Sequence, residues 1–137
     1  MLLIVAAAPQ ELDTLPGAVV GVGPVVAAAN AARILEEQRP SGVIMVGTAG
    51  AYPGGPAIGS AIVAKKIGLS YGVANMGLGY VPRAPQAIEI DPTLYADLNL
   101  PAHNVLTVGA VTTDERLAER LADGWAVEHL ECYSVAY

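Results

Sequence analysis

The alternation of short apolar runs with longer segments bearing helix signals constrains the fold more than any other feature. Residues 2–7, 43–46 and 105–108 are almost entirely apolar, as expected for parallel strands that are covered on both faces. Residues 24–38 begin with a proline and are followed by an Arg-Pro pair, which are start and stop signals of a helix. This order predicts an α/β fold, a three-layer α/β/α sandwich with a mostly parallel central sheet.

The other elements are indicated by weaker local signals. Thr112 and Glu115 have the spacing of a capping box, which predicts a helix that ends at Gly124. The remaining predictions are a helix from Pro9, a short strand over 60–65, an irregular stretch over 72–91, a short helix over 91–98 and a final helix over 126–137. There is no internal repeat and no linker composition, so residues 1–137 are predicted to form a single domain.

The composition excludes several classes of protein. Hydrophobic residues make up 53% of the chain and charged residues 15%, which argues against disorder. The net charge is −6 with only seven basic residues, so a nucleic-acid partner is not expected. No apolar run approaches the ~18 residues of a membrane span. Residues 1–8 lack a basic leader, and we interpret them as a first strand rather than a signal peptide.

The cysteine and histidine content bears on location and cofactors. A single cysteine, Cys132, excludes an internal disulfide framework and suits a cytoplasmic protein. Two histidines and one cysteine do not form a zinc-ligand pattern. We therefore expect no metal and no cofactor.

Two glycine-containing segments follow predicted strands. Residues 46–50, VGTAG, would let a ligand approach the backbone, and Thr48 adds a hydroxyl; ligands of open α/β sheets bind at such strand ends. An ordinary glycine turn explains the segment equally well. Residues 21–23, GVG, can hold an anion on exposed N–H groups before a helix, although we favour a simple tight turn. Val26 replaces the third glycine of a dinucleotide fingerprint.

Glu131 is the most informative carboxylate because it lies among Leu, Cys, Tyr and Val residues. A buried carboxylate is costly unless hydrogen-bond donors surround it. The two adjacent hydroxyls of a ribose match its two oxygens, and a buried ion pair, for example with Arg83, is the alternative. Glu11 falls in the first turn of a helix, where it either complements the helix dipole or serves as a general acid or base.

The neighbours of Glu131 have simpler interpretations. Glu128 lies three residues earlier and would share one helix side with Glu131; we favour a solvated charge near a helix N-terminus. His129 is predicted to be a surface or capping residue. Cys132 is predicted to be part of the core rather than a nucleophile, because nothing nearby would lower its pKa.

Taken together, these motifs resemble the purine nucleoside phosphorylase / nucleosidase superfamily. Glu11, the 21–23 turn, the 47–50 loop and a terminal Glu-x-x-Glu occur in that family's order. Residues 106–113, followed by 127–131, are most similar to futalosine hydrolase and next to methylthioadenosine/S-adenosylhomocysteine nucleosidases. The resemblance covers nearly the whole chain.

The resemblance implies specific roles. Glu11 aligns with the glutamate that activates the attacking water, and Glu131 with the residue that binds the ribose hydroxyls. The other substrate-binding positions that it implies are Thr48 and Gly50 around the sugar and base, Thr112 and Thr113 at the base, and Leu130 beneath the sugar. Met45 stands where many phosphorylases have a phosphate-binding arginine, so water rather than phosphate is the expected nucleophile.

The chain also departs from the family. The resemblance implies a last strand with an aspartate that protonates the purine N7, and a last helix, but no residue of these 137 matches them. We therefore expect hydrolysis of the N-glycosidic bond of a purine nucleoside, futalosine-like and hence tied to menaquinone biosynthesis. The alternatives are a non-catalytic or vestigial nucleoside-binding domain and a fragment of a longer nucleosidase. The apolar composition further predicts a homodimer or higher homo-oligomer.

Overall fold

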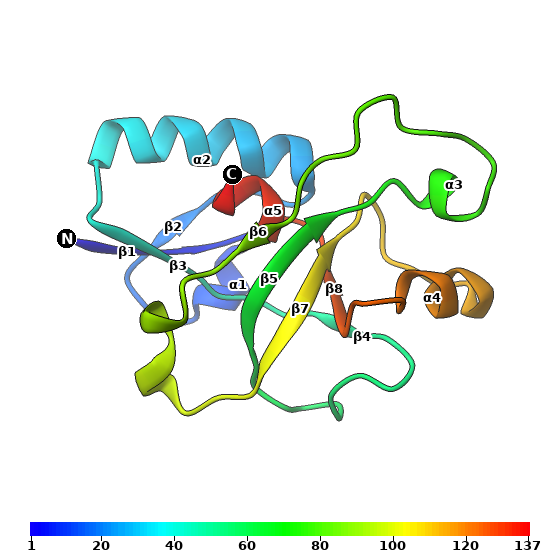
Figure 1. Ribbon diagram of the computed structural model, residues 1–137. Helices are drawn as coiled ribbons and strands as arrows, with labels where there is room; N and C mark the ends of the chain where they lie inside the picture. Colours follow the sequence, from blue (N-terminus) through cyan, green and yellow to red (C-terminus); the bar gives the residue numbers. More distant parts are fainter.

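In the computed structural model, which describes residues 1–137, eight strands form two sheets (Figure 1). The first sheet has the order β2-β1-β3 and consists of β1 (Leu2–Ala6), β2 (Ala18–Val19) and β3 (Gly42–Met45). Both neighbours run parallel to β1, with Ile4 opposite Ile44. The carboxyl ends of these strands therefore lie at one edge of the sheet.

The second sheet has the order β4-β8-β7-β5-β6. Its strands are β4 (Gly50–Ala51), β5 (Val63–Leu69), β6 (Ile88–Glu89), β7 (Ala102–Thr107) and β8 (Val127–His129). The pairs β5–β7 and β7–β8 are parallel, and the short edge strands β4 and β6 are antiparallel. The predicted mixed α/β class with mostly parallel strands is confirmed, and the strands are divided between two sheets.

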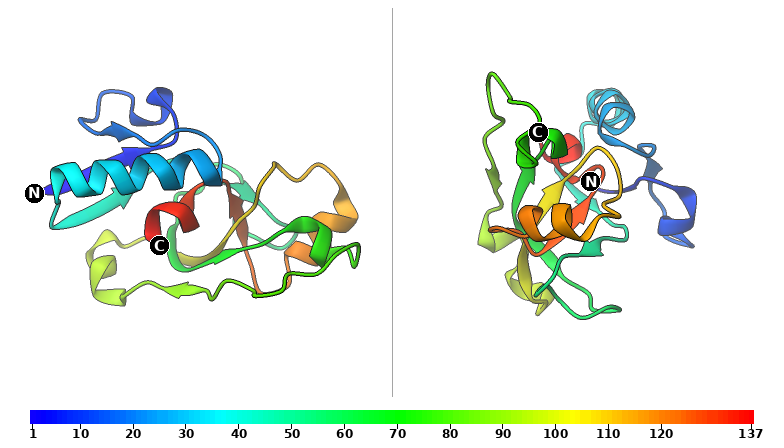
Figure 2. Two further views of the ribbon diagram at one scale, coloured as in Figure 1. Left: turned by 90° about the horizontal axis from the view of Figure 1, so that it is seen from above. Right: turned by 90° about the vertical axis from the view of Figure 1, so that its right-hand side faces the viewer.

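The helices are short except for one. They are α1 (Pro9–Leu12), α2 (Pro24–Gln38), α3 (Gly72–Asn75), α4 (Glu115–Leu121) and α5 (Cys132–Ala136), with 3-10 turns η1 (Pro92–Leu94) and η2 (Ala96–Leu98). The bounds of α2 match its sequence signals, and Arg39 ends it in a left-handed conformation. Helices α2 and α5 lie side by side (Figure 2). None of the helices has the length and apolar character needed to cross a membrane.

The core is divided in the same way as the sheets. One cluster joins β1 to α2 and consists of Leu3, Val5, Val20, Ala27, Ala31 and Ile34. The other lies beside β7 and α4 and consists of Tyr52, Leu106, Val108 and Leu121. Ser134 of α5 donates to the carbonyl of Pro24 at 2.7 Å, so the last helix is fixed against the start of α2.

The predicted helix over 126–137 is wrong in its first half. Residues 127–129 form strand β8, in which Val127 pairs with Val105 and His129 with Thr107. An apolar run this short fits a buried strand as well as a helix, and pairing with β7 decides the outcome. Glu128 and Glu131 therefore do not share a helix face, because the chain turns between β8 and α5.

Several element boundaries also differ from the sequence-based expectations. The cap of α4 is Asp114, whose carboxylate accepts the amide of Leu117 at 2.8 Å, rather than Thr112. The strand expected over 60–65 runs from Val63 to Leu69. The expected helix over 91–98 is two 3-10 turns. The stretch 72–91 is not irregular throughout, since it contains α3 and β6.

Candidate functional site

A cavity of about 420 Å³ opens at the carboxyl ends of β1, β3 and β8. Its walls include five of the seven predicted catalytic and substrate-binding residues, namely Glu11, Thr48, Gly50, Leu130 and Glu131, and also Glu128 and His129. Apolar parts of the wall come from Val22, Ala49 and Val111. Thr112 and Thr113 are not part of the lining. The topology thus brings together residues from both ends of the chain.

Glu11 is held by four hydrogen bonds. Its Oε2 accepts the amides of Ala7 at 3.1 Å and Ala8 at 3.2 Å, just after β1. Its Oε1 accepts the amide of Thr48 at 3.1 Å and the Thr48 hydroxyl at 3.3 Å. A carboxylate has about four acceptor positions, so the protein itself occupies all of them. The Thr48 hydroxyl is the longest of the four contacts and can rotate away.

Glu131 is 3% exposed and stands at the N-cap of α5. Its Oε1 accepts the amide of Gly23 at 2.7 Å. Gly23 has a φ of 91°, a conformation that favours glycine, so the GVG turn does hold an anion, namely this internal carboxylate. The ion pair with Arg83 that the sequence left open is not formed, since the ionisable side chain beside Glu131 is that of His129.

His129 is buried, in contrast to the surface position considered from the sequence, and it does cap a helix. Its Nδ1 accepts the amides of Glu131 at 3.0 Å and Cys132 at 3.2 Å. The same nitrogen lies 3.1 Å from Oε2 of Glu131. Burial lowers the pKa of His129, while the charges of Glu131 and Glu11 act in the opposite direction. The imidazole is therefore neutral at pH 7.

Glu128 is not the solvated charge that we favoured from the sequence, because it is 7% exposed and lies in β8. Its Oε1 accepts the amide of Thr112 at 2.8 Å, and its Oε2 accepts the Thr112 hydroxyl at 2.5 Å. The buried hydroxyl of Tyr52 has no hydrogen-bond partner. Burial first, and then the nearby Glu128, raises the pKa of Tyr52. Through its two hydrogen bonds to Glu128, Thr112 anchors the loop after β7, and it is not part of the cavity lining.

Cys132 follows the expectation that it is not a nucleophile. Burial, followed by the charges of Glu131 and Glu11, raises the pKa of its thiol to about 12. At neutral pH the thiolate, which is the reactive form, is therefore almost absent.

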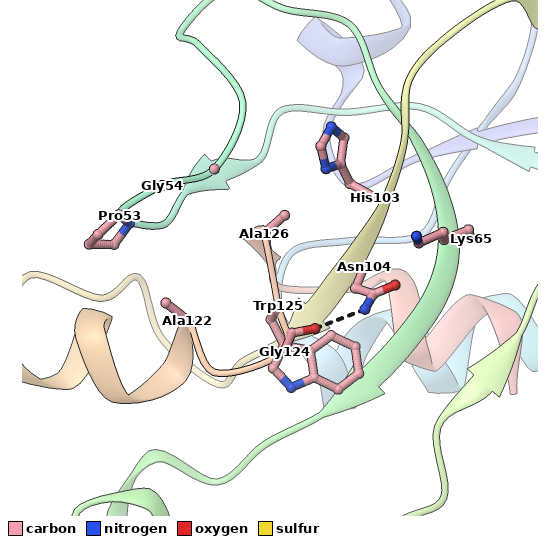
Figure 3. A pocket seen from close by; sticks show the side chains of 10 residues that line it. Pro53, Gly54, Lys65, His103, Asn104, Ala122, Gly124, Trp125 and Ala126 are labelled. Carbon is pink, nitrogen blue, oxygen red and sulfur yellow. Dashed lines mark hydrogen bonds between the residues drawn. The ribbon is translucent and has the colours of Figure 1, made fainter.

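A second cavity of about 270 Å³ lies at the amino ends of β5, β7 and β8 (Figure 3). Lys65, His103, Asn104 and Trp125 contribute to its walls, and the Asn104 amide donates to the carbonyl of Gly124 at 2.8 Å. None of the residues predicted from the sequence lines it. Ligands of α/β sheets bind at the carboxyl ends of strands, so the first cavity is the candidate site.

Two contributions to the site were missed in the sequence, the paired amides of Ala7 and Ala8 and the imidazole of His129. The anion-binding role of the 21–23 turn was considered, but a simple tight turn was favoured over it. A backbone N–H donor cannot be recognised from the sequence, except where a glycine indicates a turn that exposes it. The signal for His129 was its position between two glutamates, but this signal could be interpreted only once β8 was recognised as a strand.

The arrangement of strands and helices is similar to that of solved nucleosidases. Within that fold, the similar solved structures are 5′-methylthioadenosine/S-adenosylhomocysteine nucleosidases. The expected resemblance is thus confirmed at the level of the fold. Neither a protein-family model nor a curated protein matches the sequence.

Three of these structures illustrate the similarity. S-adenosylhomocysteine nucleosidase from Streptococcus pyogenes, in complex with 5-methylthiotubericidin, has a TM-score of 0.79 and 19% identity, covering 98% of this chain and 75% of that chain. The Campylobacter jejuni nucleosidase has a TM-score of 0.79 and 21% identity. The match covers 99% of this chain and 77% of the Campylobacter jejuni chain. The Neisseria meningitidis nucleosidase, in complex with methylthio-immucillin-A, has a TM-score of 0.78 and 16% identity. The match covers 98% of this chain and 77% of the Neisseria meningitidis chain.

The Thr112–Glu128 contact gives a direct test of the site's internal structure. Thr112→Val removes the hydroxyl donor and leaves a buried carboxylate oxygen unsatisfied. We expect the free energy of unfolding to fall by about 1–3 kcal/mol, measured by urea denaturation. Thr113→Val is the matched control, because Thr113 is exposed, and it should change stability by less than about 0.5 kcal/mol. Equal effects of the two substitutions would contradict the anchoring role.

Proposed function

We propose that this chain hydrolyses the N-glycosidic bond of a purine nucleoside and releases the free base. The observation that supports the proposal best is the placement of Glu11 and Glu131 in the wall of one cavity at the carboxyl ends of the strands. A volume of about 420 Å³ lies within the range of roughly 300–1,000 Å³ that is usual for small-ligand pockets. The nucleosidase fold of the similar structures agrees with this reaction.

Glu131 is the proposed ribose-binding residue. Its Oε1 keeps one lone pair beyond the bond from Gly23, and its Oε2 accepts no hydrogen bond while His129 is neutral. A ribose diol supplies two O–H donors at a spacing that suits these two oxygens. A carboxylate at this position would also stabilise the positive charge that develops at C1′ during cleavage.

Glu11 is the proposed general base. Release of the Thr48 hydroxyl, the longest of its four contacts, would free an acceptor position on Oε1. A water bound there can give its proton to Glu11 as it attacks C1′. Thr48 would then turn its hydroxyl toward the sugar, which agrees with the substrate-binding role that the family resemblance gives it.

A second candidate function is nucleoside binding without catalysis. It is favoured by one observation, namely that the protein already fills every acceptor position of Glu11. A carboxylate whose acceptor positions are all filled has none left for an attacking water, so the nucleoside would be bound without being cleaved.

The finer assignment of the substrate is a futalosine-like nucleoside in the cytoplasm. It is supported by the resemblance of residues 106–113 and 127–131 to futalosine hydrolase. Methylthioadenosine is the competing substrate, because the similar solved structures are methylthioadenosine/S-adenosylhomocysteine nucleosidases. Met45 in place of a phosphate-binding arginine favours water as the nucleophile in either case.

The reaction is tested by incubating the pure protein with futalosine, methylthioadenosine or inosine, with and without phosphate, and measuring free base by chromatography. We expect base release that does not depend on phosphate. Glu11→Gln should lower the rate at least ~100-fold, as expected for loss of a general base. Binding of all three nucleosides without release of base would establish the non-catalytic alternative. Absence of both binding and release would remove the proposal.

The ribose role of Glu131 predicts a selective loss of affinity in Glu131→Gln. The glutamine has the same size as the glutamate and can keep the bond from Gly23 with its carbonyl, so the fold is retained. The ribose loses a charged acceptor worth ~1.5–3 kcal/mol, which is about tenfold or more in affinity.

Calorimetry separates this role from a structural one. The loss should appear for the nucleoside, be absent for the free base, and vanish for a 2′,3′-dideoxynucleoside that lacks both hydroxyls. Glu37→Gln, at an exposed position of α2, is the matched control. Equal losses for nucleoside and base would exclude the ribose role.

Self-association is the last part of this proposal. Leu2, Val43 and Ile44 are 59%, 36% and 43% exposed on the adjacent strands β1 and β3, and β3 is an edge strand. Exposed apolar edges of this kind are usually covered by a partner. Light scattering at micromolar concentration should give a mass above the 14.0 kDa of one chain.

Charge substitutions locate the interface. Ile44→Lys should shift the protein toward the monomer, whereas Leu78→Lys, on the exposed loop after α3, should not. A monomer mass for the unmodified protein, or equal effects of the two substitutions, would rule out this interface.

A further inference from the structure

The two nitrogens of His129 have different surroundings. Nδ1 accepts the amides of Glu131 and Cys132, at 3.0 and 3.2 Å. An imidazole nitrogen can accept only while it carries no proton. The two amides therefore fix the neutral tautomer, with the proton on Nε2. Nε2 faces the segment after β3, where a Cβ placed on Gly47 would lie 3.0 Å from both Nε2 and Oε1 of Glu11.

The contact between His129 and Glu131 differs from an ordinary hydrogen bond in this tautomer. Nδ1 lies 3.1 Å from Oε2 of Glu131, but it has no proton to share. Oε2 of Glu131 therefore lies beside Nδ1 without receiving a hydrogen bond from it. The ionisable groups around the imidazole are Glu131 and Cys132 from the start of α5 and Glu11 from α1.

We propose that His129 is a positioning residue that controls whether Glu131 can bind ribose. In the neutral form, Nδ1 fixes the backbone at the start of α5 and leaves Oε2 available for a ribose hydroxyl. When Nδ1 gains a proton, it becomes an N–H donor that occupies Oε2 from within the protein. This inference rests on the proposed ribose role of Glu131.

The direction of the pH dependence follows from this geometry. One proton and one nucleoside compete for Oε2, so the affinity for nucleosides is full at neutral pH and falls as His129 becomes protonated. Burial lowers the pKa of His129, which places the transition below its ordinary value of about 6.5. Below that midpoint, affinity should fall by up to about tenfold per pH unit, as linkage with a single proton requires. By reciprocity, bound nucleoside lowers the pKa of His129.

The test compares His129→Asn with the unmodified protein. The asparagine carbonyl can accept backbone amides as a helix cap, but it does not titrate. We expect the affinity for inosine and methylthioadenosine, measured by calorimetry from pH 7.5 to 5, to fall in the unmodified protein and to stay nearly constant in His129→Asn. His103→Gln, in the second cavity, is the matched control and should keep the unmodified pH profile.

NMR of protein labelled with ¹⁵N-histidine gives a readout that does not depend on ligand. In His103→Gln only His129 is observed, and its Nδ1 should be unprotonated at pH 7.5. Adding Glu131→Gln to this variant removes the carboxylate that stabilises the imidazolium, so the midpoint of the His129 titration should move to lower pH. This result distinguishes the inference from the proposed function. If no nucleoside binds, the proposed function is excluded. The shift of the His129 titration midpoint in Glu131→Gln still tests whether His129 and Glu131 are coupled.

Any of four results would overturn the inference. The first is a pH profile of nucleoside affinity that is the same in His129→Asn and in the unmodified protein. The second is an affinity that stays constant while His129 titrates. The third is a His129 midpoint that does not change in Glu131→Gln, and the fourth is an imidazole that stays neutral until the protein unfolds.

Discussion

Three carboxylates are gathered at one end of the two sheets, and the need to supply each with hydrogen-bond donors determines how the loops there are placed. Desolvating an unpaired carboxylate costs far more than ordering a loop. Glu11 joins the segment after β1 to the segment after β3. Glu128 holds the loop that precedes α4, and Glu131 joins the start of α5 to the turn before α2. The cavity is the space that these anchored segments enclose.

The three carboxylates differ in how many acceptor positions remain free for a ligand. Glu11 and Glu128 have both oxygens occupied by donors from the protein. Glu131 has one oxygen bonded to a backbone amide and another beside the Nδ1 of His129. An acceptor that is buried, charged and only partly satisfied gives a ligand with hydroxyl groups more binding energy than a fully satisfied one.

The sequence predicted the class of fold and five of the twelve residues that line the cavity, because these depend on local signals. The apolar run of β1, the proline at the start of α2 and the glycines of the 46–50 segment each identify one element by themselves. The segment from β8 to α5 was predicted incorrectly, because its conformation depends on pairing with β7 rather than on its own periodicity. The incorrect prediction that Glu128 is a solvated charge followed from that error. The contact between Thr112 and Glu128 joins the loop after β7 to β8, and the proximity of these two segments follows from the parallel pairing of β8 with β7.

The segment from 46 to 50 limits how this cavity can diversify. A Cβ on Gly47 would lie 3.0 Å from Glu11 and His129, and a Cβ on Gly50 would lie 3.2 Å from the side chain of Glu128. Both glycines are therefore constrained by carboxylates that belong to the architecture of the site. Thr48 donates to Glu11 through its amide, and its hydroxyl is needed either there or at the sugar. On this segment, Ala49 is the one lining position where a larger side chain can narrow the cavity without disturbing the polar groups. Adaptation of this segment to a new ligand therefore depends on substitutions at a single residue.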